Sequence, residues 1–244
     1  MLCADDASDD RLSGGAIEIN PADAYAFETA LKLKDRYGAY VTVLSMSPML
    51  AEPMLRSALA MGADEAVLVC DRIFAGSDTI ATAKTLSAAL KALPRQDMIF
   101  CGSKAIDSET GHIGAQLAAL NELRYMGDVL AVNELRDGRL CVKHAGKHGA
   151  EEYSLVLPAV FSIINGTGMI RSPTIFGLRS SAKREIRIMT GDTLHLTAEQ
   201  AGKNASGTET VRIDRLSFAH RHGAYTDDVH DGAARLAEML ECAK

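Results

Sequence analysis

The sequence predicts an α/β protein whose mostly parallel β-sheet carries helices on both faces. Between residues 23 and 123, segments with helical spacing of apolar residues alternate with short apolar, β-branched segments. Helices that separate successive strands imply parallel pairing through right-handed crossovers. The strand segments are apolar at nearly every position instead of alternating, which is typical of a sheet covered on both sides.

Each element of the first half follows from its own residues. The expected helices span 23–38, 48–62 and 78–93, and another follows the loop at 101–114, where Ile113, Leu117 and Leu120 recur at helical spacing. Gly38 ends the first helix, Ser47 precedes Pro48 as an N-cap, and Ser77 caps the third. The expected strands are short and rich in Val, Leu and Ile, and they span 40–45, 66–70 and 97–101.

The pattern changes after residue 128. Two strand-like segments flank Asp137-Gly138, a dipeptide that favours a tight hairpin turn. One or two more strands are expected in 151–165, followed by an extended, irregular arm over 165–210 and a short amphipathic helix within 227–244. We therefore expect an α/β domain over residues 1–164 and a C-terminal arm and partner-binding extension over residues 165–244.

Composition excludes several classes of function. The net charge is −6 and the pI is near 5.7, which argues against general nucleic-acid binding. No apolar run of about 18 residues predicts a membrane span, and the acidic N-terminus lacks the apolar segment of a secretory signal. The five cysteines form no CxxC pair, so reduced thiols and a cytoplasmic location are expected. Nothing resembles a catalytic nucleophile with its base.

Three loops should gather at one edge of the sheet, beyond the carboxyl ends of the strands, where open parallel sheets bind ligands. They are residues 45–48, 71–79 and 101–114, and each leads into a helix N-terminus, which favours an anion such as phosphate. Ordinary βα turns with N-caps would show the same residue types. Neither standard nucleotide fingerprint is present, so the residues indicate a nucleotide-type ligand and leave its identity open.

Several stretches resemble the β subunit of electron-transfer flavoproteins: ALAMGADEAVLV (58–69), FAGSDTIAT (74–82), GSKAIDSETGHIG (102–114), residues 19–46 and residues 171–186. The resemblance implies an adenine-nucleotide hydrolase-like, Rossmann-like fold and a heterodimer with an FAD-carrying α subunit. It also implies that the β subunit holds AMP in simple members and a second FAD, reduced by NADH, in electron-bifurcating ones. FAGSDTIAT resembles the bifurcating group, so FAD is expected rather than AMP, with an acyl-CoA dehydrogenase-type flavoenzyme as a further partner.

The resemblance also implies site residues, and it assigns no catalytic residue and no metal ligand. The cofactor-binding positions are Asn20, Pro21, Ala22, Asp23, Ser45, Met46, Asp78, Thr79, Thr82, Gly102, Ala105, Ile106, Asp107, Ser108, Glu109, Thr110 and Gly114. The segment that docks on the dehydrogenase corresponds to Arg171, Ser172, Pro173, Thr174, Ile175 and Phe176, with Ile175 at the position where the family usually has a leucine anchor.

The sequence departs from the family in the loop nearest the expected phosphates. Acidic residues within 4–10 replace a lysine-containing loop, and Ser103, Lys104 and His112 replace other family residues. Three alternatives stay open: a β subunit with structural AMP, a stand-alone adenine-nucleotide-binding module, and a β subunit whose pocket has decayed. The histidines and acids at 220–231 lack the tight spacing of metal ligands, so a solvated loop is expected there.

Overall fold

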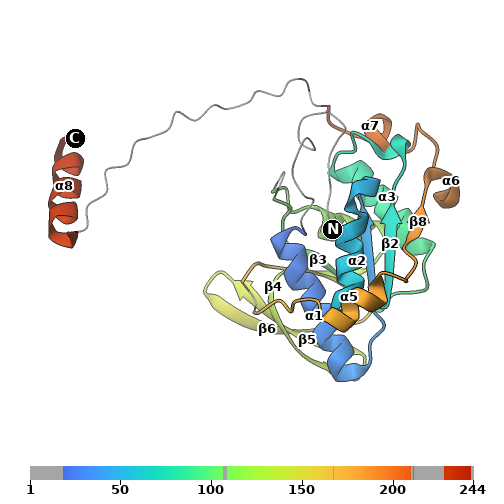
Figure 1. The fold of residues 1–244 in the computed structure, drawn as a ribbon, viewed down its shortest axis with the longest axis horizontal. Coiled ribbons are helices and arrows are strands. Elements are labelled where there is room, and N and C mark those ends of the chain that lie inside the picture. The colour runs from blue at the N-terminus through green and yellow to red at the C-terminus, as the bar shows by residue number, and fades with distance from the viewer. Residues whose placement is uncertain (1–18, 107–108, 167, 210, 212–227, 243–244) are drawn as a thin grey trace. The chain divides into compact units, whose positions relative to one another are not determined.

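The computed structural model describes residues 19–106, 109–166, 168–209, 211 and 228–242. The contacts divide the chain between Glu209 and Thr210, so the two units are treated separately. Among the described residues, the first holds all the strands and all helices but one, and the second holds that remaining C-terminal helix (Figure 1).

The elements follow one another in an α/β order. The helices are α1 (Pro21–Tyr37), α2 (Glu52–Met61), α3 (Thr79–Lys91), α4 (Ile113–Leu120), α5 (Ile175–Ser181), α6 (Gly191–Leu194), α7 (Gly202–Ala205) and α8 (Val229–Cys242), with 3-10 turns at Met49–Ala51 and Arg72–Phe74. The strands are β1 (Thr42–Met46), β2 (Glu65–Val69), β3 (Met98–Gly102), β4 (Arg124–Arg136), β5 (Arg139–Gly146), β6 (Gly149–Val156), β7 (Ala159–Ile163) and β8 (Arg187–Met189).

The strands form two sheets. One has the order β1-β2-β8 and is entirely parallel; the other has the order β3-β7-β4-β5-β6. In the second sheet β3, β7 and β4 run parallel, and β4, β5 and β6 form an antiparallel extension. The predicted α/β class with mostly parallel pairing is confirmed, although the single expected sheet is divided in two. The hairpin at Asp137-Gly138 is also confirmed, and both turn residues have positive φ.

Helices cover both faces of these sheets because the strands are apolar on both faces. Along β2, Leu68 packs with residues of α2, whereas the neighbouring Val69 packs with residues of α3. Along β7, Phe161 packs with residues of α1, whereas Val160 packs with Ala118 of α4. Buried strands of this kind are the reason why the sequence shows continuous apolar runs in place of alternation.

The two helical layers continue across both sheets. Phe27 of α1 packs against the cluster that α2 forms over β2, so α1 and α2 belong to one layer. Leu117 of α4 is part of the cluster that α3 forms on the opposite side, so α3 and α4 belong to the other. The two sheets therefore lie between the same two layers.

Two expected helix starts differ from the structure. Ser77 was predicted to cap the third helix, but the cap of α3 is Asp78, whose side chain accepts from the amides of Ile80 and Ala81. The Ser77 hydroxyl instead donates to the carbonyl of Phe74. The helix expected from Pro48 begins as the 3-10 turn Met49–Ala51 and becomes α-helical only at Glu52.

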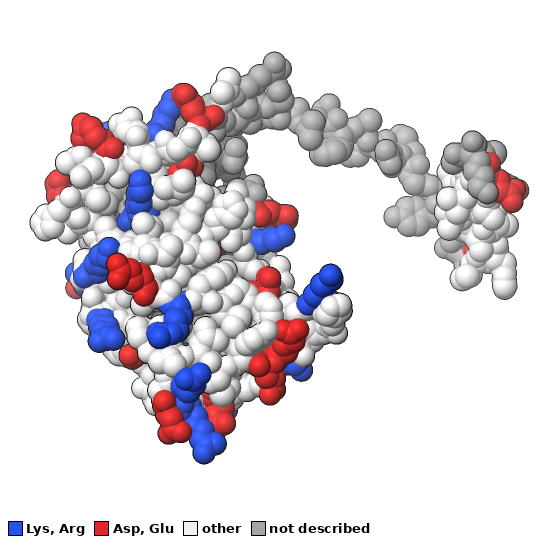
Figure 2. Space-filling model, turned by 180° about the vertical axis from the view of Figure 1, so that it is seen from behind, with Lys and Arg blue, Asp and Glu red and all other residues white. Residues whose placement is uncertain are grey.

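The segment expected as an irregular arm contains regular structure. It includes α5, α6 and α7, and its strand β8 extends the first sheet by pairing parallel with β2. Residues beyond the expected boundary at 164 thus belong to the same sheet layer as β1 and β2, and the contacts separate only after Glu209. On the face drawn in Figure 2, basic and acidic side chains of the described residues are interspersed.

Candidate functional site

Hydrogen bonds connect the loops at the carboxyl ends of the strands. The amide of Ser47, after β1, donates to the carbonyl of Val69 at the end of β2 (3.1 Å). The Gln116 side chain in α4 donates to the hydroxyl of Thr79 at the start of α3 (3.4 Å). The loops after β1, β2 and β3 are therefore held at one edge, as the sequence predicted for a ligand site.

The start of α1 is fastened to the loop after β3. Asn20, only 2% exposed, donates from Nδ2 to the carbonyl of Lys104 and to Oδ2 of Asp23, both at 2.8 Å. The other oxygen of Asp23 accepts from the amide of Gly102 (2.6 Å). Two of these contacts join residues 84 and 79 positions apart, and they explain why the polar side chains of Asn20 and Asp23 are buried where α1 begins.

Two buried acceptors at this edge have no hydrogen-bond partner among the described residues: Oδ1 of Asn20 and Oε1 of Gln116. The orientation of the Asn20 amide is fixed, because turning it over would place its oxygen against two other acceptors. A buried carbonyl oxygen without a donor costs about 1–3 kcal/mol. A ligand with O–H or N–H donors, such as a ribose or an adenine amino group, would satisfy these oxygens.

The N-termini of α1, α3 and α4 at this edge differ in how they are capped. Neither Asn20 before α1 nor His112 before α4 makes a side-chain capping bond. The start of α3, in contrast, is capped by the carboxylate of Asp78. A phosphate is therefore better placed at α4 than at α1 or α3, where it would meet the carboxylate of Asp23 or Asp78.

Asp78 holds the end of the first unit against α3. Its Oδ1 accepts from the amides of Ile80 (3.0 Å) and Ala81 (2.9 Å). Its Oδ2 accepts from the amides of Gly207 (2.7 Å) and Thr208 (3.1 Å) and from the Thr208 hydroxyl (3.2 Å). Both oxygens of this expected cofactor residue are thus engaged within the protein, as a cap and as a clamp on residues 207–208.

The hydrogen bonds of Asp78 make the free energy of unfolding depend on pH. Burial raises the pKa of Asp78, but hydrogen bonds from Ala81, Gly207 and Thr208 outweigh it and hold the pKa below its usual value. In the unfolded chain the Asp78 carboxyl has a pKa of about 3.9. Its stabilising effect is therefore complete above that pH and is lost as the pH falls through the lower pKa of the folded state. We expect Asp78→Asn to lower the unfolding free energy at pH 7 by about 1–2 kcal/mol.

The measurement is urea unfolding at pH 7, 5, 4 and 3. The difference between wild type and Asp78→Asn should shrink toward pH 3, because the wild-type carboxylate becomes protonated there. Asp137→Asn, in the exposed hairpin turn, is the matched control and should change little at any pH. A difference that is equal at pH 3 and pH 7 would contradict the assignment.

The other expected cofactor residues divide between buried and open positions. Ala22, Ser45, Met46, Thr82 and Gly114 are buried, Thr79, Gly102 and Ala105 are partly buried, and Pro21, Ile106, Glu109 and Thr110 are exposed. Asp107 and Ser108 lie outside the described residues. The sequence analysis did not include Gln116 among the site residues. Its position one turn after His112, the residue before α4, could have indicated that it lies at the same edge of the sheet.

Two glycines at this edge permit close packing of the protein itself. A Cβ on Gly102 would lie 2.7 Å from both the Cβ of Ala22 and the amide nitrogen of Asp23. A Cβ on Gly114 would lie 2.6 Å from the hydroxyl of Ser162. The space beside each glycine is thus filled by α1 or by β7, so these positions bring the helices close to the sheet.

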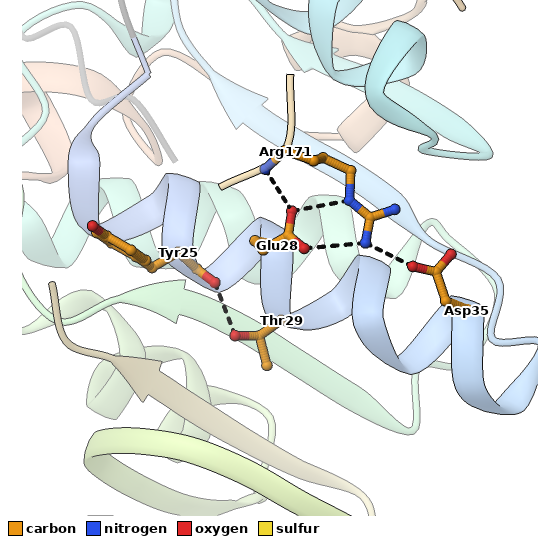
Figure 3. A network of polar contacts seen from close by, with 5 residues as sticks. All are labelled: Tyr25, Glu28, Thr29, Asp35 and Arg171. Carbon is orange, nitrogen blue, oxygen red and sulfur yellow. Dashed lines mark hydrogen bonds and ion pairs between the residues drawn. The ribbon is translucent and has the colours of Figure 1, made fainter. Parts of the chain in front are cut away.

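The segment expected to bind a partner begins with an intramolecular ion-pair network. Nε and Nη2 of Arg171 donate to the two carboxylate oxygens of Glu28 (3.0 and 3.1 Å), and Nη2 also donates to Asp35 (2.7 Å) (Figure 3). The backbone amide of Arg171 adds a third bond to Glu28 (3.1 Å). Arg171 therefore fastens this segment to α1.

The next residues present apolar side chains outward. Thr174 caps α5 by accepting from the amide of Gly177, which sits against the carbonyl of Ala60 in α2. Ile175 and Phe176 are 83% and 86% exposed. Ser172 is also exposed, and Pro173 is partly buried. An anchored short helix with two protruding apolar residues is a surface suited to a protein partner.

The histidines and acids weighed as metal ligands lie partly outside the described residues, since His220, His222 and Asp227 are not described. Among the residues that are described, no three His, Cys, Asp or Glu side chains are grouped closely enough to hold a metal ion. Within the same residues, no helix is both long and apolar enough to span a bilayer.

Comparison with known proteins gives concordant matches. The model of the electron transfer flavoprotein domain family matches residues 13–187. Electron transfer flavoprotein subunit beta of Thermoanaerobacterium thermosaccharolyticum is 36% identical, over 91% of this chain and 85% of the relative. Caffeyl-CoA reductase-Etf complex subunit CarD of Acetobacterium woodii is 35% identical, over 80% and 74%. Protein FixA of Azotobacter vinelandii is 34% identical, over 80% and 72%.

Proposed function

The chain belongs to the electron transfer flavoprotein family and is similar to its β subunits, and we propose that it binds the adenylate part of FAD at the starts of α1 and α4. In this proposal the chain forms a heterodimer with an α subunit that carries its own FAD. The bound flavins supply the redox chemistry, accepting a hydride and passing electrons on one at a time. The chain itself binds and orients the nucleotide.

The observation that carries this proposal is the unpartnered Oδ1 of Asn20, buried where α1 meets the loop after β3. It needs a hydrogen-bond donor, and the ribose hydroxyls and adenine amino group of FAD are donors. The uncapped start of α4 favours its pyrophosphate. Gln116 supplies a second acceptor at the same edge. The residues present therefore fit an adenine nucleotide.

FAD is preferred over AMP for a reason that lies in the sequence. The stretch FAGSDTIAT resembles the electron-bifurcating group, in which the β subunit holds a second flavin. One relative is named as a subunit of a caffeyl-CoA reductase-Etf complex, which supports a role beside a CoA-dependent flavoenzyme. A flavin held at this site would be the group that accepts a hydride from NADH. AMP in the same adenylate site is the alternative.

Two apolar surfaces support the proposed protein partners. Ile175 and Phe176 protrude from α5 and would dock on an acyl-CoA dehydrogenase-type flavoenzyme. In the second unit, α8 exposes Val229, Leu236 and Leu240, which recur at helical spacing and would bind the α subunit.

Co-expression with the cognate α subunit tests the proposal. The complex is purified and denatured, and the released nucleotides are identified and counted. Two FAD per heterodimer are expected; one FAD with one AMP would favour the simple β subunit. A colourless monomer that binds adenylate alone would favour the stand-alone module, and a complex whose only nucleotide is the α-subunit FAD would overturn nucleotide binding by this chain.

Variants at the buried acceptors locate the nucleotide. Asn20→Leu should weaken nucleotide binding by the β subunit roughly 10- to 100-fold, because it removes an acceptor and the contacts that fix the α1 start. Gln116→Met should weaken it by a factor nearer 10, because it removes that acceptor, and the lost bond from Nε2 to the Thr79 hydroxyl should cost about 0.5–1.5 kcal/mol of folding stability. Asn133→Leu, on the exposed part of β4, is the control. Unchanged nucleotide content in both site variants would contradict the placement.

A further inference from the structure

The first turn of α4 lies directly against the second sheet at Gly114. A Cβ on Gly114 would lie 2.6 Å from Oγ of Ser162 and 2.8 Å from Sγ of Cys101. It would also lie 3.0 Å from Cε2 of the Tyr125 ring. A methyl group does not fit at these distances. The position of this turn is therefore set by Ser162, Cys101 and Tyr125, which together form the seat of α4.

The seat of α4 is a row across three neighbouring strands. Cys101 of β3 pairs in register with Ser162 of β7, and Tyr125 lies in β4, on the other side of β7. The Tyr125 hydroxyl donates to Oγ of Ser162 (3.1 Å), and Oγ of Ser162 lies 3.3 Å from Sγ of Cys101. Ser162, which is 2% exposed, therefore links the other two side chains.

Each polar hydrogen of the seat has an acceptor. Burial raises the pKa of the Cys101 thiol to about 11, so the thiol keeps its proton, and it donates to the carbonyl of Phe161 (3.6 Å). The Ser162 hydroxyl is then the donor to Sγ of Cys101, and the Tyr125 hydroxyl is the donor to Ser162. A polar network in which every member is satisfied favours a single arrangement. The seat is thus a well-defined support for α4.

A bulge in β4 makes room for the Tyr125 hydroxyl. Gly127 and Asp128 of β4 both lie opposite the single residue Ser162 of β7. A Cβ on Gly127 would lie 3.1 Å from the Tyr125 hydroxyl oxygen. Asp128 has a φ of 47°, which costs energy for a residue other than glycine. Bulges redirect side chains and are frequent beside functional sites, and this one lies where the seat is formed.

We propose that the seat of α4 positions the first-turn amides of α4 for the phosphates of the bound nucleotide, with Ser162 as its central residue. The inference rests on the proposed function, in which the start of α4 favours the pyrophosphate. Hydrogen bonds from an amide weaken beyond about 3.2 Å, so a small displacement of this turn loses phosphate contacts. Ser162, Cys101 and Tyr125 act through α4 and need not touch the nucleotide, so they are positioning residues.

Calorimetric titration of the full-length chain with ADP and with adenosine tests the proposal. The ratio of the two dissociation constants, adenosine over ADP, measures what the phosphates contribute to binding. Gly114→Ala lifts the first turn from the seat and should lower this ratio roughly 5- to 20-fold. Ser162→Ala removes the link between Tyr125 and Cys101 and should lower it about 2- to 5-fold. Leu59→Ala, buried in α2 of the opposite helical layer, is the matched control. It lowers stability but should leave the ratio unchanged, because unfolding weakens the binding of both ligands equally.

A compensating pair of substitutions provides a second measurement. Combining Gly114→Ala with Ser162→Ala removes the atom nearest to the new Cβ, so the ratio should rise about twofold or more above that of Gly114→Ala alone. If Gly114→Ala does not fold, Ser162→Ala decides by the same ratio. Variants that weaken ADP and adenosine equally would overturn the positioning role and leave nucleotide binding intact. A wild-type ratio near one would instead overturn phosphate binding at α4, and with it the proposed function.

Discussion

Replacing Arg171 with alanine is expected to lower the free energy of unfolding by about 2–4 kcal/mol, one of the largest effects of any single side chain in the first unit. The substitution leaves the Glu28 carboxylate, whose side chain is only 6% exposed, without its counter-ion. Removing one partner of a buried pair costs more than the pair contributes, because the remaining charge stays buried. The loss is smaller than for a fully buried pair because the Arg171 side chain is 31% exposed and solvent screens its charge.

Urea unfolding of three variants separates this effect from simple loss of charge. Asp35→Asn removes the outer, 60% exposed partner of Arg171 and should cost less than about 1 kcal/mol. Combining Glu28→Gln with Arg171→Met should cost less than Arg171→Ala alone, because no buried charge is left unpaired. If Arg171→Ala were no more destabilising than Asp35→Asn, the buried pair would not be what holds this segment to α1.

Substituting Gly102 with valine is the second large effect we expect, with a loss of about 3 kcal/mol in the free energy of unfolding. The new Cβ would lie 2.7 Å from the Ala22 side chain and from the backbone of Asp23, so the first turn of α1 has to move away from β3. That turn carries Asn20, and the hydrogen bond from the Gly102 amide to Asp23 would be strained as well. Stability and nucleotide binding should therefore fall together.

The matched control is Gly207→Ala, whose Cβ meets nothing closer than 3.6 Å and whose amide stays free to donate to Asp78. It should retain both stability and bound nucleotide. Nucleotide counting on the purified heterodimer, together with urea unfolding, measures both quantities. A Gly102→Val chain that is destabilised yet keeps its full nucleotide content would separate the α1 start from the binding site.

Local patterns predicted most elements of the α/β core. The strands at 40–45, 66–70 and 97–101 differ from β1, β2 and β3 by one or two residues at each end, and the Asp137-Gly138 turn follows from turn chemistry alone. β8 was missed because it has three residues with no internal periodicity, and only its pairing with β2 makes it a strand. Such non-local pairing is absent from a local pattern.

The candidate site was predictable only in part, for the same reason. Helix starts after apolar strands locate the loops, but the bond from Asn20 to Lys104 joins residues 84 positions apart. Arg171 was expected on a partner surface, and the structure pairs it with Glu28 because that acid is buried on the side of α1 facing the segment. Which of two adjacent polar residues caps a helix, Ser77 or Asp78, is decided by the path of the loop.

Asp78 fastens two parts of the first unit with one carboxylate. Its Oδ1 caps α3, and its Oδ2 accepts from the amides of Gly207 and Thr208, just before the contacts of the first unit end at Glu209. Because one protonation weakens both sets of bonds, acid should release the start of α3 and residues 207–208 in a single step.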